Sequence, residues 1–181
     1  MTESSDTSAH EGTAIPADDL RRALTIANPA APELSHISVA GDTYTILVSG
    51  EQTGGRYCLI DMHVPPGGGP PPHRHDFEEM FTLLEGELSF TFRGKTVTIA
   101  AGSSVNIPAN APHSFRNIAD KPARMLCMCA PSGLDEFFTA IGDRVDSRTA
   151  PPPHLNPADI AERQAKAAAL AGRYRTELLT H

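Results

Sequence analysis

The chain has 181 residues, 40% of them hydrophobic, and a formal net charge of −7. This length suits one domain with a buried core, and the negative charge argues against a nucleic-acid partner. No apolar run approaches the roughly 20 residues that span a membrane, and MTESSDTSAHEGTA (1–14) lacks the basic and apolar segments of a secretory signal. We therefore expect a soluble cytoplasmic protein.

The chain begins with two segments that precede the main domain. Residues 1–16 are polar and without periodicity, which predicts a disordered tail. An N-terminal arm covers residues 17–33. Within PADDLRRALTIANP (16–29), Leu20 and Leu24 are spaced to share one side of one or two helical turns.

Residues 34–131 have the sequence pattern of an all-β domain. Short runs rich in Val, Ile, Tyr and Phe are separated by Gly- and Pro-containing turns, among them a tight turn at RGK (93–95). Apolar residues recur with a period of two, as in half-buried strands, at Tyr44, Ile46 and Val48; at Cys58, Ile60, Met62 and Val64; at Leu88, Phe90 and Phe92; and at Val97 and Ile99. Many short strands at regular spacing predict a β-sandwich or β-barrel.

Residues 132–181 predict a helical extension. PSGLDEFFTAIG (131–142) indicates a short helix with Ser132 as its N-cap. After a proline-rich link, Asn156 precedes Pro157, a pair typical of a helix start, and Gly172 lies near the expected end of that helix.

One stretch of the β region, PPPHRHDFEEMF (70–81), sets two histidines one residue apart, with two glutamates beyond. If the segment is extended, His73, His75 and Glu79 point to the same face. This parity selects Glu79 over Glu78, although a bulge would invert the choice. Imidazoles with a carboxylate suit Fe, Mn, Co, Ni, Cu or Zn. A chance grouping remains the alternative for this triplet alone.

A second stretch, GSSVNIPANAPHSFRN (102–117), places His113 after a proline-containing turn. Together the two stretches resemble the two motifs of the cupin superfamily. The first motif, G-x5-H-x-H-x3-E-x6-G, is matched at Gly67, His73, His75, Glu79 and Gly86. The second, G-x5-P-x-G-x2-H-x3-N, is matched at Gly102, Pro108, His113 and Asn117. Asn110 replaces the glycine of that motif, and asparagine is the next-best residue for a left-handed turn.

The resemblance extends over about residues 35–131 and implies a fold and a cofactor. The implied fold is a cupin β-barrel, a double-stranded β-helix or jelly roll, here followed by short C-terminal helices. The implied cofactor is one divalent transition-metal ion of unknown identity (Fe, Mn, Ni, Co, Cu or Zn), bound at the open mouth of the barrel by His73, His75, Glu79 and His113. A metal-free cupin with a purely structural role is the alternative.

The residues around the ligand strand predict a substrate pocket. Phe81 and Leu83 continue the ligand face and Phe115 lies close to His113, so an apolar, partly aromatic lining is expected. The same residues could instead only fill the barrel. His63 falls on the opposite face of its strand and is interpreted as a surface residue or a group near the mouth. Solvent exposure is expected for the remaining histidines, His10, His36, His154 and His181.

The three cysteines leave one thiol unpaired under any disulfide scheme. Cys127 and Cys129 would share one strand face but are poorly placed to bridge each other. We interpret Cys58, Cys127 and Cys129 as small buried hydrophobic residues rather than as a redox or metal site.

Three functions compete for such a barrel, because fold does not settle function. The layout resembles small quercetin dioxygenase-like cupins, which implies a metal-dependent dioxygenase with Glu79 as ligand and base toward an aromatic or enolisable, flavonol-like substrate. The second hypothesis is a non-redox isomerase, lyase or cyclase in which Glu79 or His63 moves a proton. The third is a small-molecule-binding module without turnover.

The expected partners are a small-molecule substrate and a second copy of the chain. No nucleic acid or membrane is expected. Cupins are commonly homodimers, and LSHISVA (34–40) could add to a neighbour's sheet to cover a barrel edge, unless the C-terminal helix covers it instead.

Overall fold

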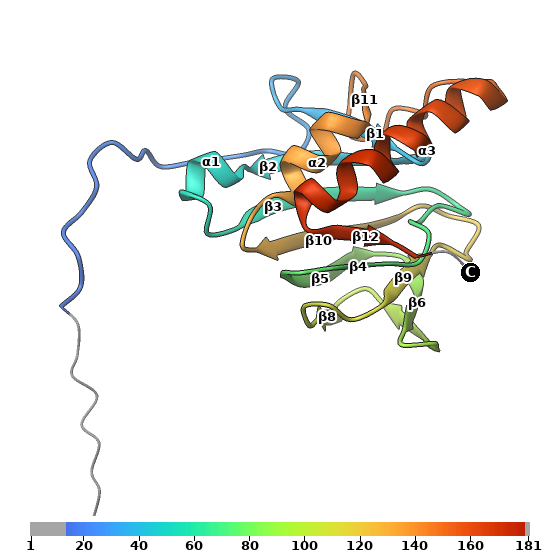
Figure 1. The fold of residues 1–181 in the computed structure, drawn as a ribbon, viewed down its shortest axis with the longest axis horizontal. Coiled ribbons are helices and arrows are strands. Elements are labelled where there is room, and N and C mark those ends of the chain that lie inside the picture. Colours follow the sequence, from blue (N-terminus) through green and yellow to red (C-terminus); the bar gives the residue numbers. More distant parts are fainter. Residues whose placement is uncertain (1–13, 180–181) are drawn as a thin grey trace, which may run out of the picture.

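Two antiparallel β-sheets face each other in the computed structural model, which describes residues 14–179 (Figure 1). The larger sheet has seven strands, in the spatial order β11 (Asp143–Arg144), β1 (His36–Val39), β2 (Asp42–Val48), β3 (Cys58–Val64), β10 (Ala123–Ala130), β5 (Glu78–Glu85) and β8 (Ser104–Ile107). The smaller has five, in the order β12 (Thr176–Leu178), β4 (His73–His75), β9 (His113–Arg116), β6 (Glu87–Phe92) and β7 (Lys95–Ala100). The predicted all-β barrel is confirmed.

The period-two patterns correspond to strands whose apolar side chains fill the space between the sheets. Along β10, buried and half-buried residues alternate over all eight positions. The inner side chains of β3 are fully buried and join Phe81, Phe90 and Phe115 in one core. β2 departs from this pattern because Asp42, Thr43, Tyr44 and Thr45 are all buried, so both of its faces are covered there.

The hairpin β6–β7 is closed by the tight turn that the sequence predicts. Phe92 pairs with Lys95, and the two residues between them, Arg93 and Gly94, have φ of 48° and 78°. Positive φ at both central positions matches the right-handed twist of the strands that follow. β7 is an edge strand, and its Val97 is 55% exposed.

Two of the three α-helices differ from the sequence-based expectation. A one-turn helix, α1 (Gly50–Thr53), with a capping box between Ser49 and Gln52, was not predicted. The helix α2 (Leu134–Ile141) forms as expected, but the prediction of Ser132 as its N-cap is wrong, because Gly133 holds that position without a side-chain cap. The carboxylate of Asp135 instead accepts from the backbone N–H of Gly133 and of Gly50, which ties α2 to α1.

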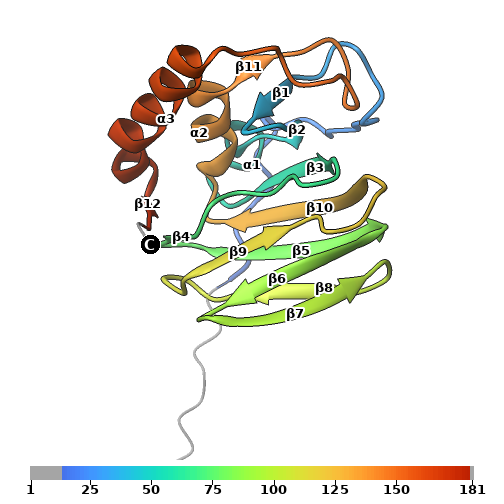
Figure 2. The same cartoon turned by 90° about the vertical axis from the view of Figure 1, so that its right-hand side faces the viewer.

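The helix α3 (Pro157–Ala171) begins and ends as predicted. The side chain of Asn156 accepts from the backbone N–H of Asp159, Pro157 opens the helix, and Gly172 is the C-cap. A 3₁₀ turn, η1 (Gly172–Tyr174), leads into β12. The extension thus adds an edge strand to each sheet, β11 beside β1 and β12 beside β4, while α2 and α3 lie together at one end of the barrel (Figure 2).

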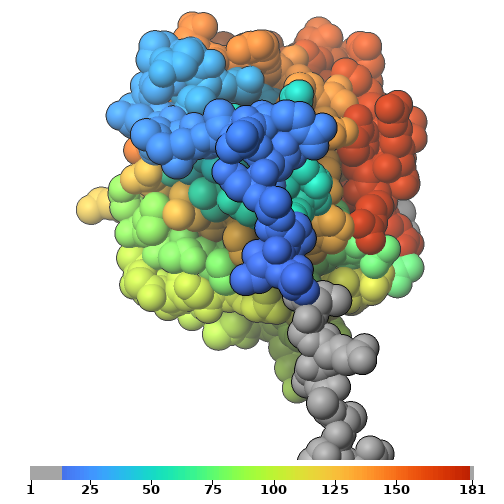
Figure 3. Space-filling model, turned by 90° about the vertical axis from the view of Figure 1, so that its left-hand side faces the viewer, coloured from blue at the N-terminus to red at the C-terminus, as the bar shows by residue number. Residues whose placement is uncertain are grey.

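The N-terminal arm runs along the outside of the molecule without regular structure (Figure 3). The prediction of helical turns in residues 16–29 is wrong, because the segment has isolated turns but no helix, and Leu20 and Leu24 are 89% and 86% exposed. A helix this short is marginal unless a face is buried, and no face is buried here. The predicted tail lies mostly in residues 1–13, which with His10 and His181 fall outside the described residues.

Within residues 14–179, no helix is long and apolar enough to cross a membrane.

Candidate metal centre

The segment that carries the first two histidines and the glutamate spans both sheets. His73 and His75 lie on β4 of the five-stranded sheet, whereas Glu79 lies on β5 of the seven-stranded sheet. The chain bends between them at Asp76 and Phe77. Since the two sheets face each other, the side chains of His73, His75 and Glu79 still converge. Glu79 is buried and Glu78 is exposed, which agrees with the choice of Glu79.

Glu78 illustrates the opposite face. It is exposed, and its carboxylate accepts hydrogen bonds from Asn106 Nδ2 and from the backbone N–H of Ala109, both at 3.1 Å. Both contacts are therefore made on the outside of the barrel.

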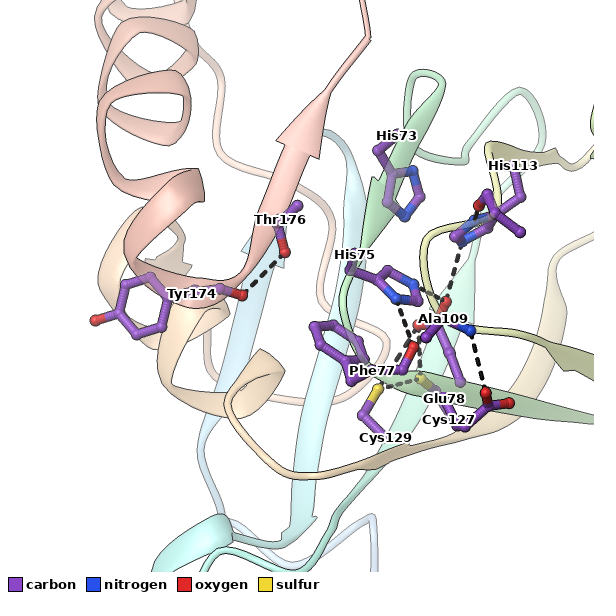
Figure 4. Close-up of polar contacts among 12 residues, drawn as sticks. His73, His75, Phe77, Glu78, Ala109, His113, Cys127, Cys129, Tyr174 and Thr176 are labelled. Atoms are coloured by element: carbon purple, nitrogen blue, oxygen red, sulfur yellow. Dashed lines mark hydrogen bonds and ion pairs between the residues drawn. The ribbon is translucent and has the colours of Figure 1, made fainter.

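Four side chains meet between the sheets. One donor atom from each of His73, His75, Glu79 and His113 lies within 4.8 Å of the other three. Glu79 Oε2 is 2.9 Å from His75 Nε2 and 3.1 Å from His113 Nε2. Figure 4 shows the three imidazoles turned toward one another, with β12 alongside β4, the strand of His73 and His75. His75, Glu79 and His113 are buried, and His73 is partly exposed.

Backbone carbonyls orient all three imidazole rings. His73, His75 and His113 each place Nδ1 at 2.9–3.0 Å from a carbonyl oxygen two residues away, of Pro71, Phe77 and Ala111 respectively. A carbonyl only accepts, so each Nδ1 carries the proton and Nε2 of the neutral ring is left as a lone pair. This second contact fixes the tautomer and ring direction that a metal-binding histidine needs.

The donors therefore fit a cation. In the neutral rings, the Nε2 lone pairs of His75 and His113 face an oxygen of Glu79 that also only accepts. Such contacts repel unless a proton or a cation is shared among the donors. Atoms bound to one ion at about 2.0–2.2 Å and at right angles lie about 3 Å apart, which agrees with the contacts around Glu79. The four residues form a cluster able to hold a metal ion.

The surroundings keep the donors in their ligand forms. Burial alone would raise the pKa of Glu79, but His113 and His75 lower it below its ordinary value when either ring shares a proton with the carboxylate. Burial, reinforced by the neighbouring His113, lowers the pKa of His73 to about 4. An ionised carboxylate and a neutral imidazole are the states that bind metals.

The turns within the two motifs have left-handed backbone conformations, which glycine and asparagine adopt most readily. Gly67, Gly86 and Gly102 have φ of 78°, 79° and 90°, a region that suits glycine. Asn110 has φ of 66°, so asparagine does adopt the left-handed conformation at the position of the motif's glycine. Asn117 is buried, and its Nδ2 donates to the carbonyls of Val64 and Lys121 at 2.9 and 2.8 Å.

Comparison with known proteins agrees with this geometry. Residues 60–129 match the cupin domain family. Residues 60–129 thus form a cupin domain.

Relatives of this cupin are distant. It is 29% identical to the quercetin 2,3-dioxygenase of Bacillus subtilis over 128 residues, which cover 70% of this chain and 37% of that protein. It is 34% identical to the polyketide synthase CurC of Streptomyces cyaneus over 94 residues, 50% of this chain and 60% of that protein. In both cases the cupin matches less than two thirds of the relative's length.

A solved structure supports the fold. The crystal structure of a predicted oxalate decarboxylase from Thermotoga maritima superposes with a TM-score of 0.52 at 24% identity, over 59% of this chain and 98% of that one. At this identity the likeness concerns the fold alone.

The four-donor cluster opens into a cavity of about 700 Å³, to which His73 and Glu79 contribute. The walls are mostly apolar, and their aromatic residues come from both sheets and from α2: Tyr44, Phe81, Phe115, Phe137 and Phe138. Two of these residues, Phe81 and Phe115, were expected in the pocket from the sequence, and their rings lie 5.6 Å apart. Leu83, also predicted for the pocket, is buried but is not among the lining residues.

The C-terminal extension completes the cavity wall, a role that the sequence did not reveal. The lining includes Leu134 and Ile141 of α2, the link from Pro151 to Leu155, and Ile160 of α3. Apolar residues at helical spacing predict that one face of a short helix is buried, but they do not identify the strands against which the helix packs.

A buried carboxyl lies next to this cavity. The Tyr44 hydroxyl donates to Asp42 Oδ2 at 3.1 Å, whereas Asp42 Oδ1 is buried without a hydrogen-bond partner in the described structure. Burial raises the pKa of Asp42 to about 7, although the Tyr44 hydroxyl and the backbone N–H of Gly69 act in the opposite direction.

The three other histidines of the described residues lie outside the four-donor cluster. His63 lies on the outer face of β3, near Arg148 and Asp61, and does not line the cavity; burial and then Arg148 lower its pKa. The prediction that His36 is exposed is wrong: it is 2% exposed, with Nδ1 2.8 Å from Thr45 Oγ1. His154 is exposed, as predicted.

A contact between the cysteines and the four-donor cluster was not predicted from the sequence. All three cysteines are buried free thiols, as expected. Cys127 Sγ, however, is 3.2 Å from Glu79 Oε1, and Cys129 Sγ is 3.8 Å from the same oxygen. Burial, together with the nearby Glu79 carboxylate, raises the pKa of Cys127 to about 12. The pairing of β10 with β5 produces this contact, and strand register is not visible in the sequence.

Proposed function

We propose that this cupin is a metal-dependent dioxygenase that acts on a small aromatic or enolisable, flavonol-like substrate. The observation that carries the proposal is a four-donor cluster, His73, His75, Glu79 and His113, at the wall of an aromatic-lined cavity of about 700 Å³. A cavity of this size, with few polar groups, suits a small apolar molecule. The similarity to a quercetin 2,3-dioxygenase supports the same substrate class.

Four residues would hold the cofactor. A divalent ion (Fe, Mn, Ni, Co, Cu or Zn) bound by His73, His75, Glu79 and His113 would supply a Lewis-acidic or redox-active centre for a substrate oxygen. The rings of Phe81, Phe115 and Phe138 would pack against the substrate and exclude water from it.

Glu79 is the proposed base. Its Oε2 faces the histidines and its side chain lines the cavity, so a substrate hydroxyl that enters beside the cluster meets this oxygen. Removal of the hydroxyl proton by Glu79 Oε2 makes the substrate an electron-rich enolate. His63 takes no part, because it lies outside the barrel.

Oxygen consumption tests the proposal. The protein, reconstituted in turn with iron, manganese, nickel and cobalt, is mixed with quercetin in an oxygen electrode, with Glu79→Gln as the inactive variant and Glu78→Gln as the matched control. We expect oxygen uptake by wild type and Glu78→Gln, and a loss of about 100-fold or more in Glu79→Gln. Metal-loaded protein that consumes no oxygen with any enolic substrate contradicts a dioxygenase.

A non-redox lyase, isomerase or cyclase is the second candidate, supported by the similarity to a polyketide synthase. The same cavity and the same Glu79 oxygen would serve it, with proton transfer on an enolisable carbonyl compound and no use of oxygen. Product formation from a polyketide-like β-diketone under argon would distinguish this candidate from the first.

We also propose that the protein works in a reducing compartment such as the cytoplasm, where its free thiols stay reduced.

We propose in addition that the protein pairs with a second copy of itself. β1 cannot extend a neighbour's sheet as residues 34–40 suggested, because it already pairs with β2 and β11. The arm is the better candidate, with Ile15, Leu20, Leu24 and Ile26 each 86–95% exposed. A dimer by light scattering that dissociates in Leu20→Asp/Leu24→Asp supports this; a wild-type monomer contradicts it.

A further inference from the structure

The two oxygens of the Glu79 carboxylate have different neighbours. Oε2 faces His75 and His113, at 2.9 and 3.1 Å. Oε1 faces the opposite way, toward the sulfur atoms of Cys127 at 3.2 Å and Cys129 at 3.8 Å. Among the described residues, these thiols are the only hydrogen-bond donors that reach Oε1. Figure 4 shows the two sulfur atoms below the imidazole cluster.

Strand register produces this arrangement. In the pairing of β5 with β10, Cys129 lies opposite Glu79 and Cys127 lies opposite Phe81. Side chains at these positions point to the same face of the sheet, into the barrel. The diagonal neighbour Cys127 approaches Oε1 more closely than Cys129 does, and the two sulfur atoms are 3.6 Å apart.

A glutamate that binds a metal ion through one oxygen needs a contact that prevents its carboxylate from rotating about the Cγ–Cδ bond. The backbone cannot do this for Glu79, since no backbone N–H of the described residues donates to its carboxylate. Cys127 is 0% exposed and does not line the cavity, so the side of Glu79 that faces it is closed to solvent. The S–H group is a weak donor, yet it is the nearest one available to a fully buried anion.

We propose that Cys127 is a positioning residue for the metal centre: its S–H holds Glu79 Oε1, so that Oε2 faces the three imidazoles. This proposal rests on the metal centre of the proposed function. Contacts made behind a metal ligand typically change metal affinity by about 10–100-fold when they are removed. Cys129 lies next to Cys127, and its Sγ is 3.6 Å from Cys127 Sγ and 3.8 Å from Glu79 Oε1.

The test is the affinity for Co²⁺ and Zn²⁺, measured by competition with a chromophoric chelator, together with the visible spectrum of the Co²⁺ form. In Cys127→Ala, Oε1 loses its nearest donor and the carboxylate can rotate, so we expect about 10-fold weaker binding and an altered Co²⁺ spectrum. In Cys127→Ser the hydroxyl can donate in place of the thiol, and we expect an affinity within about threefold of wild type.

Cys58→Ala is the matched control. Cys58 is a buried free thiol on β3, directly paired with Cys129, and it makes no hydrogen bond to Glu79. Its removal leaves a similar void in the same layer of the core, with an expected loss of stability but an unchanged metal affinity. Thermal unfolding of each variant shows that the protein measured is folded.

Three results would overturn the proposal. Cys127→Ala could bind Co²⁺ as tightly as wild type, with the same spectrum. Cys127→Ala and Cys58→Ala could weaken binding equally, which would assign the effect to packing. Wild-type protein that binds neither ion would remove the metal centre itself, and with it both this proposal and the proposed function. In the first two cases the proposed function still stands.

Discussion

The two halves of the site are built by different parts of the chain. Residues 67–117 supply all four donors, from β4, β5 and β9, and hold them with backbone carbonyls and left-handed turns. Residues 134–160 supply much of the cavity wall but no donor. We therefore expect the first segment to determine whether a metal binds, and the second to determine which substrate fits.

The largest effect is expected from the donor segment. Glu79→Gln removes the only carboxylate charge of the cluster while keeping the shape of the side chain, and we expect metal affinity to fall by about 100-fold or more. A competition titration with a chromophoric chelator measures this.

Glu78→Gln is the control for that change, since it alters the adjacent glutamate on the exposed face. Its metal affinity should equal that of wild type. Equal losses in the two variants would mean that general charge, rather than ligation, governs binding.

The cavity segment should respond in substrate binding alone. Phe138 lines the cavity and its ring lies 4.5 Å from that of Tyr44. Phe138→Ala removes apolar contact worth about 1–2 kcal/mol, so quercetin should bind about 10-fold more weakly. Fluorescence quenching measures the affinity, and the metal content should not change.

Val97→Ala, on the exposed edge strand β7, is the corresponding control. A change in metal content in Phe138→Ala would show that the two halves of the site are coupled, and would weaken the division of roles proposed above.

A separate effect concerns stability and its dependence on pH. The pKa of Asp42 is about 7 in the folded protein and about 3.9 in an unfolded chain. The folded state thus binds the proton more tightly, and this group's contribution to stability is lost as pH rises from about 4 to about 7. Asp42→Asn should remove that loss, which is at most about 4 kcal/mol.

Urea unfolding at pH 4, 6 and 8 measures the stability of both proteins. We expect the stability of the variant relative to wild type to increase with pH. Parallel pH profiles would show that Asp42 keeps an ordinary pKa in the folded state.

The smallest effect is expected at the turn before His113. Asn110 has φ of 66°, so Asn110→Ala should cost about 1 kcal/mol while Asn110→Gly should be nearly neutral. Urea unfolding of the two variants separates them. If both variants lose the same stability, the Asn110 side chain is more important than its backbone conformation.

Much of the donor half could be predicted from the sequence. The odd-numbered spacing of His73, His75 and Glu79 survives because it depends on local alternation, even though the chain bends and changes sheets between the second and third donors. The motif glycines and Asn110 likewise report local backbone conformation. The period-two patterns of β3 and β6 also predicted which side chains face the core.

The cavity half could not be predicted, because it depends on contacts between distant segments. The partners of α2, the pairing of β12 with β4 and the cover over Asp42 leave no local pattern. His36 and Cys127 show the same limit, since a polar context at His36 and an apolar one at Cys127 gave no indication of Thr45 or Glu79 as partners.

The most direct test of the account is the amount of transition metal bound per chain, measured by mass spectrometry on chelator-free protein. His75→Ala removes a donor, and His36→Ala removes a buried histidine outside the cluster. We expect about one ion per chain in wild type and in His36→Ala, and almost none in His75→Ala. Wild-type protein without metal after reconstitution, or His75→Ala that retains it, would contradict the metal centre.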